Sequence, residues 1–212
     1  MGLASASLFV MAKAIVISAD EIKKTMPGYQ PEKSGDFHRE SARLADKEYT
    51  QTVRASDNKH VILLSGGAAS GKTEYLSAYL MDGNAIILDG TLPTLEGFLI
   101  KYRMAKQHGK EVSIHAVVPD DLRRAFVAFL ERERKFDEEH FYRTHACSRK
   151  TLLEIANKYD DVRITMITSY FKRKNEKMEF RELIYRDRND LVEYLRRIQY
   201  TEEEIVKIVS GT

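Results

Sequence analysis

Residues 61–73 read Val61-Ile62-Leu63-Leu64-Ser65-Gly66-Gly67-Ala68-Ala69-Ser70-Gly71-Lys72-Thr73. From Gly66 onward they match the phosphate-binding pattern G-x-x-x-x-G-K-[ST] at every fixed position. The apolar run before the loop is typical of a strand buried on both faces, and the spacing of Tyr75, Leu76, Tyr79 and Leu80 predicts a helix after it. A strand, a glycine loop and a helix in this order indicate a nucleotide-binding site.

The residue types of the loop suit a bound triphosphate. Glycine lets the backbone approach phosphate oxygens, and the start of a helix offers free N–H groups and a partial positive charge. Lys72 is expected to reach the terminal phosphates and Thr73 to ligate magnesium. The residues expected to bind the nucleotide are Gly66, Gly67, Ala68, Ala69, Ser70, Gly71, Lys72 and Thr73.

Composition indicates an ordinary soluble protein. The chain has 212 residues, a net charge of +2 and one cysteine, Cys147, which suits a reducing cytoplasm. The near-neutral charge argues against binding of long nucleic acid. Lys13 interrupts the apolar residues at the start, so neither a secretory signal nor a membrane span is expected, and Met11 is an alternative start.

Five short apolar runs alternate with amphipathic stretches, which predicts an α/β fold with a parallel five-stranded sheet of the P-loop NTPase type, flanked by helices. This domain is expected to span residues 1–170, with residues 1–12 as a flexible N-terminus. The expected strands are 14–18, 61–65, 85–88, 112–118 and 162–168.

The carboxy-terminal part, residues 171–212, is interpreted as a helical extension packed on the same domain. Leu183, Ile184, Leu191, Leu195 and Ile198 are assigned to helices, and Thr201 to Glu204 form a capping box that opens the last one. The basic cluster at 172–177 contains no aromatic residue and is interpreted as a solvated turn rather than a nucleic-acid contact.

Ligands of parallel sheets bind at the carboxyl ends of the strands, where Asp20 and Asp89 stand beside the phosphate loop. Asp20 can serve as a general base, as a cap for the helix that follows, or as both. Asp89 can hold magnesium or a substrate hydroxyl, or only form the turn before Gly90. Arg132, Arg134 and Arg143 can stabilise a transferring phosphoryl group from a lid, but at least one of them is expected in a surface salt-bridge ladder.

Three segments together resemble the zeta toxin family of P-loop kinases. They are 17–29, with Asp20 at a strand end and Pro27-Gly28-Tyr29 downstream, 84–92, with Asp89-Gly90-Thr91, and 116–144, with Glu131-Arg132 and Arg143-Thr144. The likeness covers residues 14–170. In the family the phosphate-loop unit comes first, whereas here the aspartate unit precedes it, so the two strand–helix units have exchanged places.

The resemblance implies transfer of phosphate from ATP or GTP, with Mg²⁺, to the sugar 3′ hydroxyl of UDP-N-acetylglucosamine. It makes Asp20 the base, Lys72 and Thr73 the donor and metal contacts, and Arg132 and Arg143 the phosphoryl stabilisers. Glu48, Asp89 and Thr91 would contact the substrate, with Asp89 also near the metal. Any antitoxin partner would be a separate chain.

Two other functions stay open on the residues alone. The acceptor can be a nucleoside, an NAD-like ribose or a polynucleotide end. Alternatively, the chain can bind a nucleotide and switch a partner without phosphoryl transfer.

Overall fold

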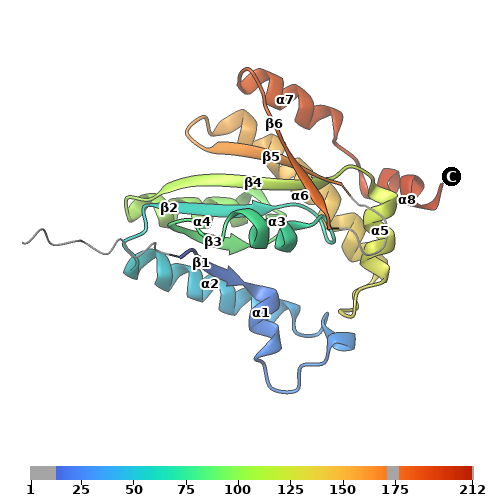
Figure 1. Cartoon of the computed structure of the whole chain (residues 1–212), viewed down its shortest axis with the longest axis horizontal. Helices are drawn as coiled ribbons and strands as arrows, with labels where there is room; N and C mark the ends of the chain where they lie inside the picture. Colours follow the sequence, from blue (N-terminus) through green and yellow to red (C-terminus); the bar gives the residue numbers. More distant parts are fainter. Residues whose placement is uncertain (1–12, 171–176, 212) are drawn as a thin grey trace, which may run out of the picture.

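The five apolar runs form neighbouring parallel strands of one sheet (Figure 1). The computed structural model describes residues 13–170 and 177–211. Its parallel strands are β1 (Ile15–Ser18), β2 (His60–Ser65), β3 (Ala85–Asp89), β4 (Glu111–Pro119) and β5 (Arg163–Tyr170). The sheet order is β1-β3-β2-β4-β5-β6, so the predicted α/β architecture with a parallel sheet is confirmed.

The sixth strand corrects the prediction. β6 (Glu179–Leu183) pairs antiparallel with β5, so the count of five strands is wrong, as is the helical assignment of Leu183. Ile184 directly follows this strand and is 94% exposed. β6 lies at the sheet edge, and its sequence EFREL therefore lacks the continuous apolar run of a strand buried on both faces. The basic cluster at 172–177 falls outside the described residues, except for Lys177.

Side-chain caps mark the starts of several helices. Thr94, Asp121, Asp137 and Asp187 each accept a hydrogen bond from a backbone N–H of the first turn, and the predicted capping box at Thr201 forms. The helices are α1 (Ala19–Lys24), α2 (His38–Ala55), α3 (Lys72–Tyr79), α4 (Leu95–Gln107), α5 (Leu122–Leu130), α6 (Glu138–Lys158), α7 (Arg188–Arg197) and α8 (Glu202–Ser210), with a 3₁₀ turn η1 (Pro31–Lys33).

Helices cover the two faces of the sheet unequally. α2, α4, α6 and α7 bury one face in a core that includes Tyr49, Phe98, Leu152 and Leu195. α3 covers the other face through Tyr75 and Leu76. α5 and α8 lie beyond the carboxyl ends of the strands, at the right of Figure 1, where they pack with α6 and the phosphate loop.

The register of the parallel strands places the predicted site residues at one edge of the sheet, formed by the carboxyl ends of the strands. Ser18 of β1 is paired with Asp89 of β3, and Asp20 follows two residues later. β3 in turn pairs with β2, which ends at Ser65, directly before the phosphate loop. The edge strand β1 therefore presents its carboxyl end beside the loop although it precedes the loop in the chain.

Across residues 13–170 and 177–211, no helix combines the length and the apolar character needed to cross a membrane.

Candidate active site

The phosphate loop has a backbone that depends on its glycines. Gly66 and Gly71 have φ values of 139° and 88°, in the region that favours glycine. A Cβ on Gly66 would lie 2.2 Å from the carbonyl oxygen of Val117 in β4, so a side chain there has no space. Ala69 also has a positive φ, of 58°, which L-residues seldom adopt.

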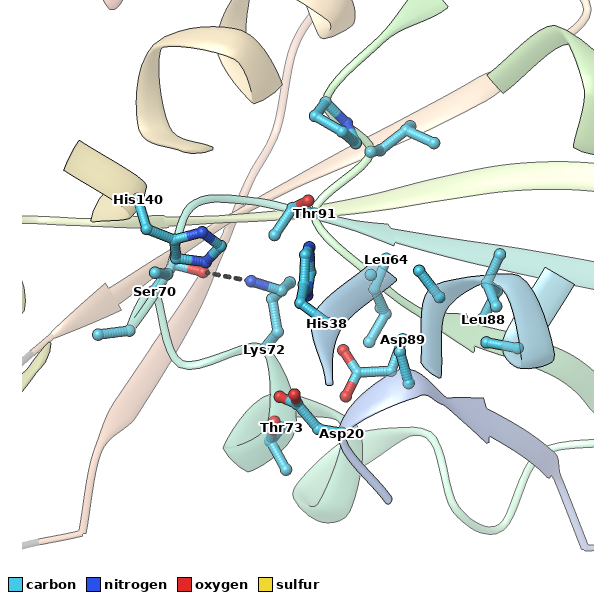
Figure 2. Close-up of a pocket in the computed structure, with 18 of the residues that line it drawn as sticks. Asp20, His38, Leu64, Ser70, Lys72, Thr73, Leu88, Asp89, Thr91 and His140 are labelled. Atoms are coloured by element: carbon cyan, nitrogen blue, oxygen red, sulfur yellow. Dashed lines mark hydrogen bonds between the residues drawn. The ribbon is translucent and has the colours of Figure 1, made fainter. Parts of the chain in front are cut away.

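Lys72 lies inside the curve of this loop. Its ammonium donates to the carbonyl oxygens of Gly66 (2.9 Å) and Gly67 (2.8 Å), and to the hydroxyl of Ser70 at 3.4 Å. Figure 2 shows the contact with Ser70. Burial lowers the pKa of Lys72 to about 8, although the carboxylate of Asp89 opposes this shift. The site is therefore a concave cradle with a cation at its centre.

Neighbouring strand ends fix the loop. The N–H of Gly66 and the hydroxyl of Ser65 both donate to the carbonyl of Thr91, after β3, each at 3.4 Å. The hydroxyl of Ser169, at the end of β5, donates to the carbonyl of Ser70 at 2.7 Å and is fully buried. Strands on both sides of β2 thus contribute to the shape of the loop.

Asp20 lies in the first turn of α1 and is bound by two cations. Its carboxylate pairs with Lys23 at 3.2 Å and with the guanidinium of Arg134. Burial raises the pKa of Asp20, but the charges of Arg134 and Lys23 outweigh burial, so the pKa lies below its ordinary value. The N-cap of α1 is Ser18, so the interpretation of Asp20 as the helix cap is wrong.

Asp89, the last residue of β3, has a different environment. No hydrogen bond or ion pair involves its carboxylate within the described parts of the chain. Burial raises the pKa of Asp89, and the charge of Lys72 only partly offsets this effect. A half-buried carboxylate without a cation partner is suited to a ligand that brings positive charge.

Two arginines reach the site from the segment between α5 and α6, residues 131–137. Arg134 forms the ion pair with Asp20 rather than a surface ladder with its neighbours. The side chain of Arg132 lines the cavity, and within residues 13–170 and 177–211 it makes no hydrogen bond or ion pair. Burial and the neighbouring charge of Arg134 lower the pKa of Arg132, which as a guanidinium still stays charged.

Aromatic contacts hold this segment over the site. Phe136 stacks on His140 of α6, with ring centroids 4.3 Å apart, and meets His38 of α2 edge-on at 5.9 Å. The ammonium of Lys23 lies 4.8 Å from the centre of the Phe136 ring. The backbone N–H of Lys135 also donates to the carbonyl of Pro31 at 3.1 Å. Residues 131–137 therefore form a docked lid.

These elements enclose a cavity of about 280 Å³. Figure 2 shows Asp20, Lys72, Thr73 and Asp89 converging on it, with His38 and His140 alongside. The predicted site residues that line it are Asp20, Ala68, Ala69, Ser70, Gly71, Lys72, Thr73, Asp89, Thr91 and Arg132. Gly66 and Gly67 belong to the same loop but do not line the cavity.

Two further predicted site residues, Glu48 and Arg143, lie away from both the loop and the cavity. Glu48 lies exposed on α2, because the cavity-facing stripe of this helix runs through His38, Ala42, Ala45 and Asp46. Arg143 lies exposed on α6, whose buried stripe includes Phe141, Thr144 and His145. Neither side chain lines the cavity, so the assignments of Glu48 to substrate and of Arg143 to the phosphoryl group have no support from its geometry and stay predictions.

The cavity also contains residues that sequence reasoning missed. Asp46 and Lys101 form an ion pair at 2.9 Å on its α2–α4 side, and Lys23 is almost fully buried beneath it. The four-residue spacing of His38, Ala42 and Asp46 was a signal that could have placed Asp46 on the cavity face. No sequence signal pointed to the pairing of Arg134 with Asp20.

Comparison with known proteins gives little further information. No protein-family model matches the chain, and no curated protein matches it. Among solved structures, the chain is similar to one from the PezAT chromosomal toxin–antitoxin system of Streptococcus pneumoniae, with 13% sequence identity and a TM-score of 0.37. The match covers 82% of this chain and 92% of that chain. A likeness this weak assigns no function.

Proposed function

We propose that the chain is a magnesium-dependent kinase that transfers a phosphoryl group from ATP or GTP to a hydroxyl of a small molecule. The supporting observation is one cavity lined by the phosphate loop with Lys72 on one side and by the carboxylates of Asp20 and Asp89 on the other. A kinase needs these parts together: a cradle for the donor phosphates, a base for the acceptor hydroxyl and cations for the transferring group.

The donor side is formed by this chain's backbone and cations. The start of α3 and the loop N–H groups favour phosphate oxygens, and Lys72 lies where it can exchange loop carbonyls for phosphate. Arg132 has no competing carboxylate among the described residues and can bind the transferring group through two N–H bonds. Arg132 therefore takes the role of phosphoryl stabiliser.

The residues present fit a magnesium ion that is held mainly by substrate. Mg²⁺ in kinases keeps several waters and uses one or two carboxylates with the substrate phosphates. Among the described residues, no three His, Cys, Asp or Glu side chains form a group that could hold a metal ion, so substrate phosphates and water would complete the coordination. Thr73 and the unpaired carboxylate of Asp89 would hold the ion, which would neutralise phosphate charge when bound.

The acceptor side is assigned to Asp20. Its carboxylate is ionised, lines the cavity and can accept the proton of an attacking hydroxyl. The resemblance of segments 17–29, 84–92 and 116–144 to zeta toxins favours a nucleotide sugar such as UDP-N-acetylglucosamine as the acceptor. Thr91 and Asp89 line the same cavity and are proposed as substrate contacts, and a separate antitoxin chain as a partner.

A phosphoryl-transfer assay tests this proposal. The chain is incubated with ATP or GTP and Mg²⁺ against UDP-sugars, nucleosides, NAD and short oligonucleotides, and products are read by mass. Lys72→Ala should reduce transfer by about 10²–10³. The control Lys158→Ala removes an exposed lysine at the end of α6 and should leave transfer unchanged.

The panel separates the alternatives. A phosphorylated nucleotide sugar formed only by Lys72-containing protein supports the full proposal. Transfer to a different compound supports kinase activity and contradicts a nucleotide sugar as the acceptor. Nucleotide binding without any transfer contradicts the proposal and favours a regulatory switch.

A further inference from the structure

Three buried polar residues of α6 are linked to the phosphate loop, two by direct contact and the third through one of these two. Thr144, His145 and Arg149 are 6%, 0% and 3% exposed. They lie on the same face of the helix, at four-residue spacing or next to it. Their polar atoms need partners at this depth, and the loop supplies two of them, the N–H and the carbonyl of Ala68.

Ala68 of the loop is held by both of its backbone groups. Its N–H donates to the hydroxyl oxygen of Thr144 at 3.0 Å. Its carbonyl oxygen lies 2.9 Å from Nε2 of His145. Because two adjacent residues of one helix bind both groups, they set the orientation of the Ala68 peptide, directly before the positive-φ residue Ala69.

Arg149 decides which nitrogen of His145 carries the proton. One guanidinium nitrogen of Arg149 lies 3.0 Å from Nδ1 of His145 and donates to the His145 carbonyl at the same distance. A guanidinium has only donors, so Nδ1 must be the acceptor. Burial and the charge of Arg149 hold the pKa of His145 well below its ordinary value, so the ring is neutral. The remaining proton is on Nε2, where it is donated to Ala68.

The buried charge of Arg149 is unfavourable for the stability of the fold. Within residues 13–170 and 177–211 no carboxylate pairs with it, and its Nε has no hydrogen-bond partner. Its other stabilising neighbours there are two tyrosines: Tyr200, whose ring lies 5.8 Å away, and Tyr194. Burying a charge without a counter-ion is unfavourable, and an apolar side chain of similar volume would normally be more stable. Stability therefore does not account for an arginine at this position.

The ring of His145 packs directly against Gly67 of the phosphate loop. A Cβ on Gly67 would lie 2.2–2.4 Å from three atoms of the ring. The backbone of Gly67 is not in the left-handed region, so the ring alone excludes a side chain there. The loop and the ring thus fit each other directly.

We propose that His145 and Arg149 are positioning residues of the phosphate loop: Arg149 fixes the Nε2–H tautomer of His145, which with Thr144 orients the Ala68 peptide for phosphate binding. This inference rests on the proposed nucleotide-binding function of the loop but not on the identity of the acceptor.

Binding of Mg-ATP by calorimetry, together with thermal unfolding, tests the proposal. Arg149→Met and His145→Phe should weaken Mg-ATP binding at least tenfold, because His145→Phe removes the donor to Ala68 and Arg149→Met removes the group that fixes the tautomer of that donor. His145→Gln keeps an amide N–H near the position of Nε2 and should recover most of the affinity. Tyr49→Phe is the matched control, since it removes one buried hydrogen bond to a backbone carbonyl, that of Lys101. It should lower the unfolding temperature without changing affinity.

Two measurements do not depend on whether Arg149→Met folds. In the unmutated protein, ¹⁵N shifts of the His145 ring should show the neutral Nε2–H tautomer; the Nδ1–H tautomer would overturn the proposal. Gly67→Ala should weaken Mg-ATP binding because its methyl group meets the His145 ring. The double variant Gly67→Ala/His145→Ala should bind Mg-ATP no more weakly than Gly67→Ala alone, because this ring is then absent. Independent, additive losses would overturn the proposal.

The outcomes also separate this inference from the proposed function. If the unmutated protein binds Mg-ATP and the Arg149 and His145 variants bind it equally well, only the inference fails. The inference also fails if the loss of affinity in Tyr49→Phe matches theirs, since the role would then be structural. If the unmutated protein binds no nucleotide, both fail.

Discussion

The carboxylate of Asp20, which follows β1, forms an ion pair with the guanidinium of Arg134 from the docked lid. Lys23 binds the same carboxylate from the next turn of α1. The pair joins the start of α1 to the segment that also carries Arg132. A carboxylate held by two cations is ionised, but it is a weaker base than a free one.

Asp20→Asn should abolish most phosphoryl transfer while Mg-ATP binding stays within a few-fold. Loss of a general base costs about 10²–10⁴ in rate, and the amide keeps the volume of the side chain. Single-turnover kinetics measure the loss of phosphoryl transfer, and calorimetry measures the retained Mg-ATP binding. Transfer at the unmutated rate would remove Asp20 from the role of base.

Arg134→Gln should shift the acid limb of the pH dependence of kcat/KM to higher pH. Arg134 lowers the pKa of Asp20, so without it the carboxyl protonates at higher pH and the base is lost sooner on acidification. The control Arg43→Gln breaks the exposed pair with Glu40 and should leave the profile unchanged. If the acid limb does not shift in Arg134→Gln, then Arg134 does not control the protonation of Asp20.

Binding of Mg-ATP at pH 8 should take up protons. The pKa of Lys72 is about 8 in the free protein, so about half of the ammonium is deprotonated there, and bound phosphate raises its pKa. Binding heats in two buffers of different ionisation enthalpy should indicate uptake of about half a proton at pH 8 and almost none at pH 6.5. In Lys72→Met this buffer dependence should disappear; if it persists, another group is responsible.

Gly66→Ala should destabilise the protein by about 2–3 kcal/mol and weaken nucleotide binding, since the methyl group meets the Val117 carbonyl and the backbone has positive φ. Gly35→Ala is the control, because nothing lies within 4 Å of its added Cβ and its φ is ordinary. Chemical unfolding of the two variants checks the contrast. Equal stabilities would show that the loop adopts a different backbone.

His140→Phe should reduce the loss of stability on acidification. Burial and the neighbouring His38 lower the pKa of His140 to about 4, so between about pH 6.5 and 4 the unfolded chain binds more protons than the folded one. Stability contributed by neutral His140 is therefore lost as pH falls through that window. Unfolding temperatures at pH 7 and pH 5 should differ less in the variant, which keeps the ring stacked on Phe136. An unchanged difference would place the acid sensitivity elsewhere.

Local patterns of the sequence predict the parallel sheet well. Strands buried on both faces require continuous apolar residues, and the runs at Val61–Ser65 and Ala85–Leu88 have this character. β6 lacks it because it is an edge strand with polar residues such as Glu179 and Arg181. Its pairing with β5 is decided by the tertiary structure, which the composition of five residues does not reveal.

The site is predictable only where its residues are consecutive or follow strands. The phosphate loop, Asp20 and Asp89 meet because parallel strands end at the same edge. Helix residues need the phase of the helix as well: Glu48 was assigned by position, while the stripe through His38, Ala42 and Asp46 faces the cavity. The contacts of Thr144 and His145 with Ala68 join residues more than seventy positions apart, and no local pattern encodes them.

The place of β1 in the sheet has a consequence for folding. Within residues 13–170 and 177–211, β1 pairs only with β3, and that pairing joins Ile15 to Ile86. By contrast, β2, α3 and β3 are consecutive and close with a much shorter loop. Closure of long loops costs more entropy, so the contacts with low contact order form first. We therefore expect the phosphate cradle to assemble before Asp20 docks beside it, and the four-residue edge strand β1 to open more readily than the central strands. In a partly folded chain the proposed nucleotide cradle would therefore be in place before Asp20, the residue proposed as the base.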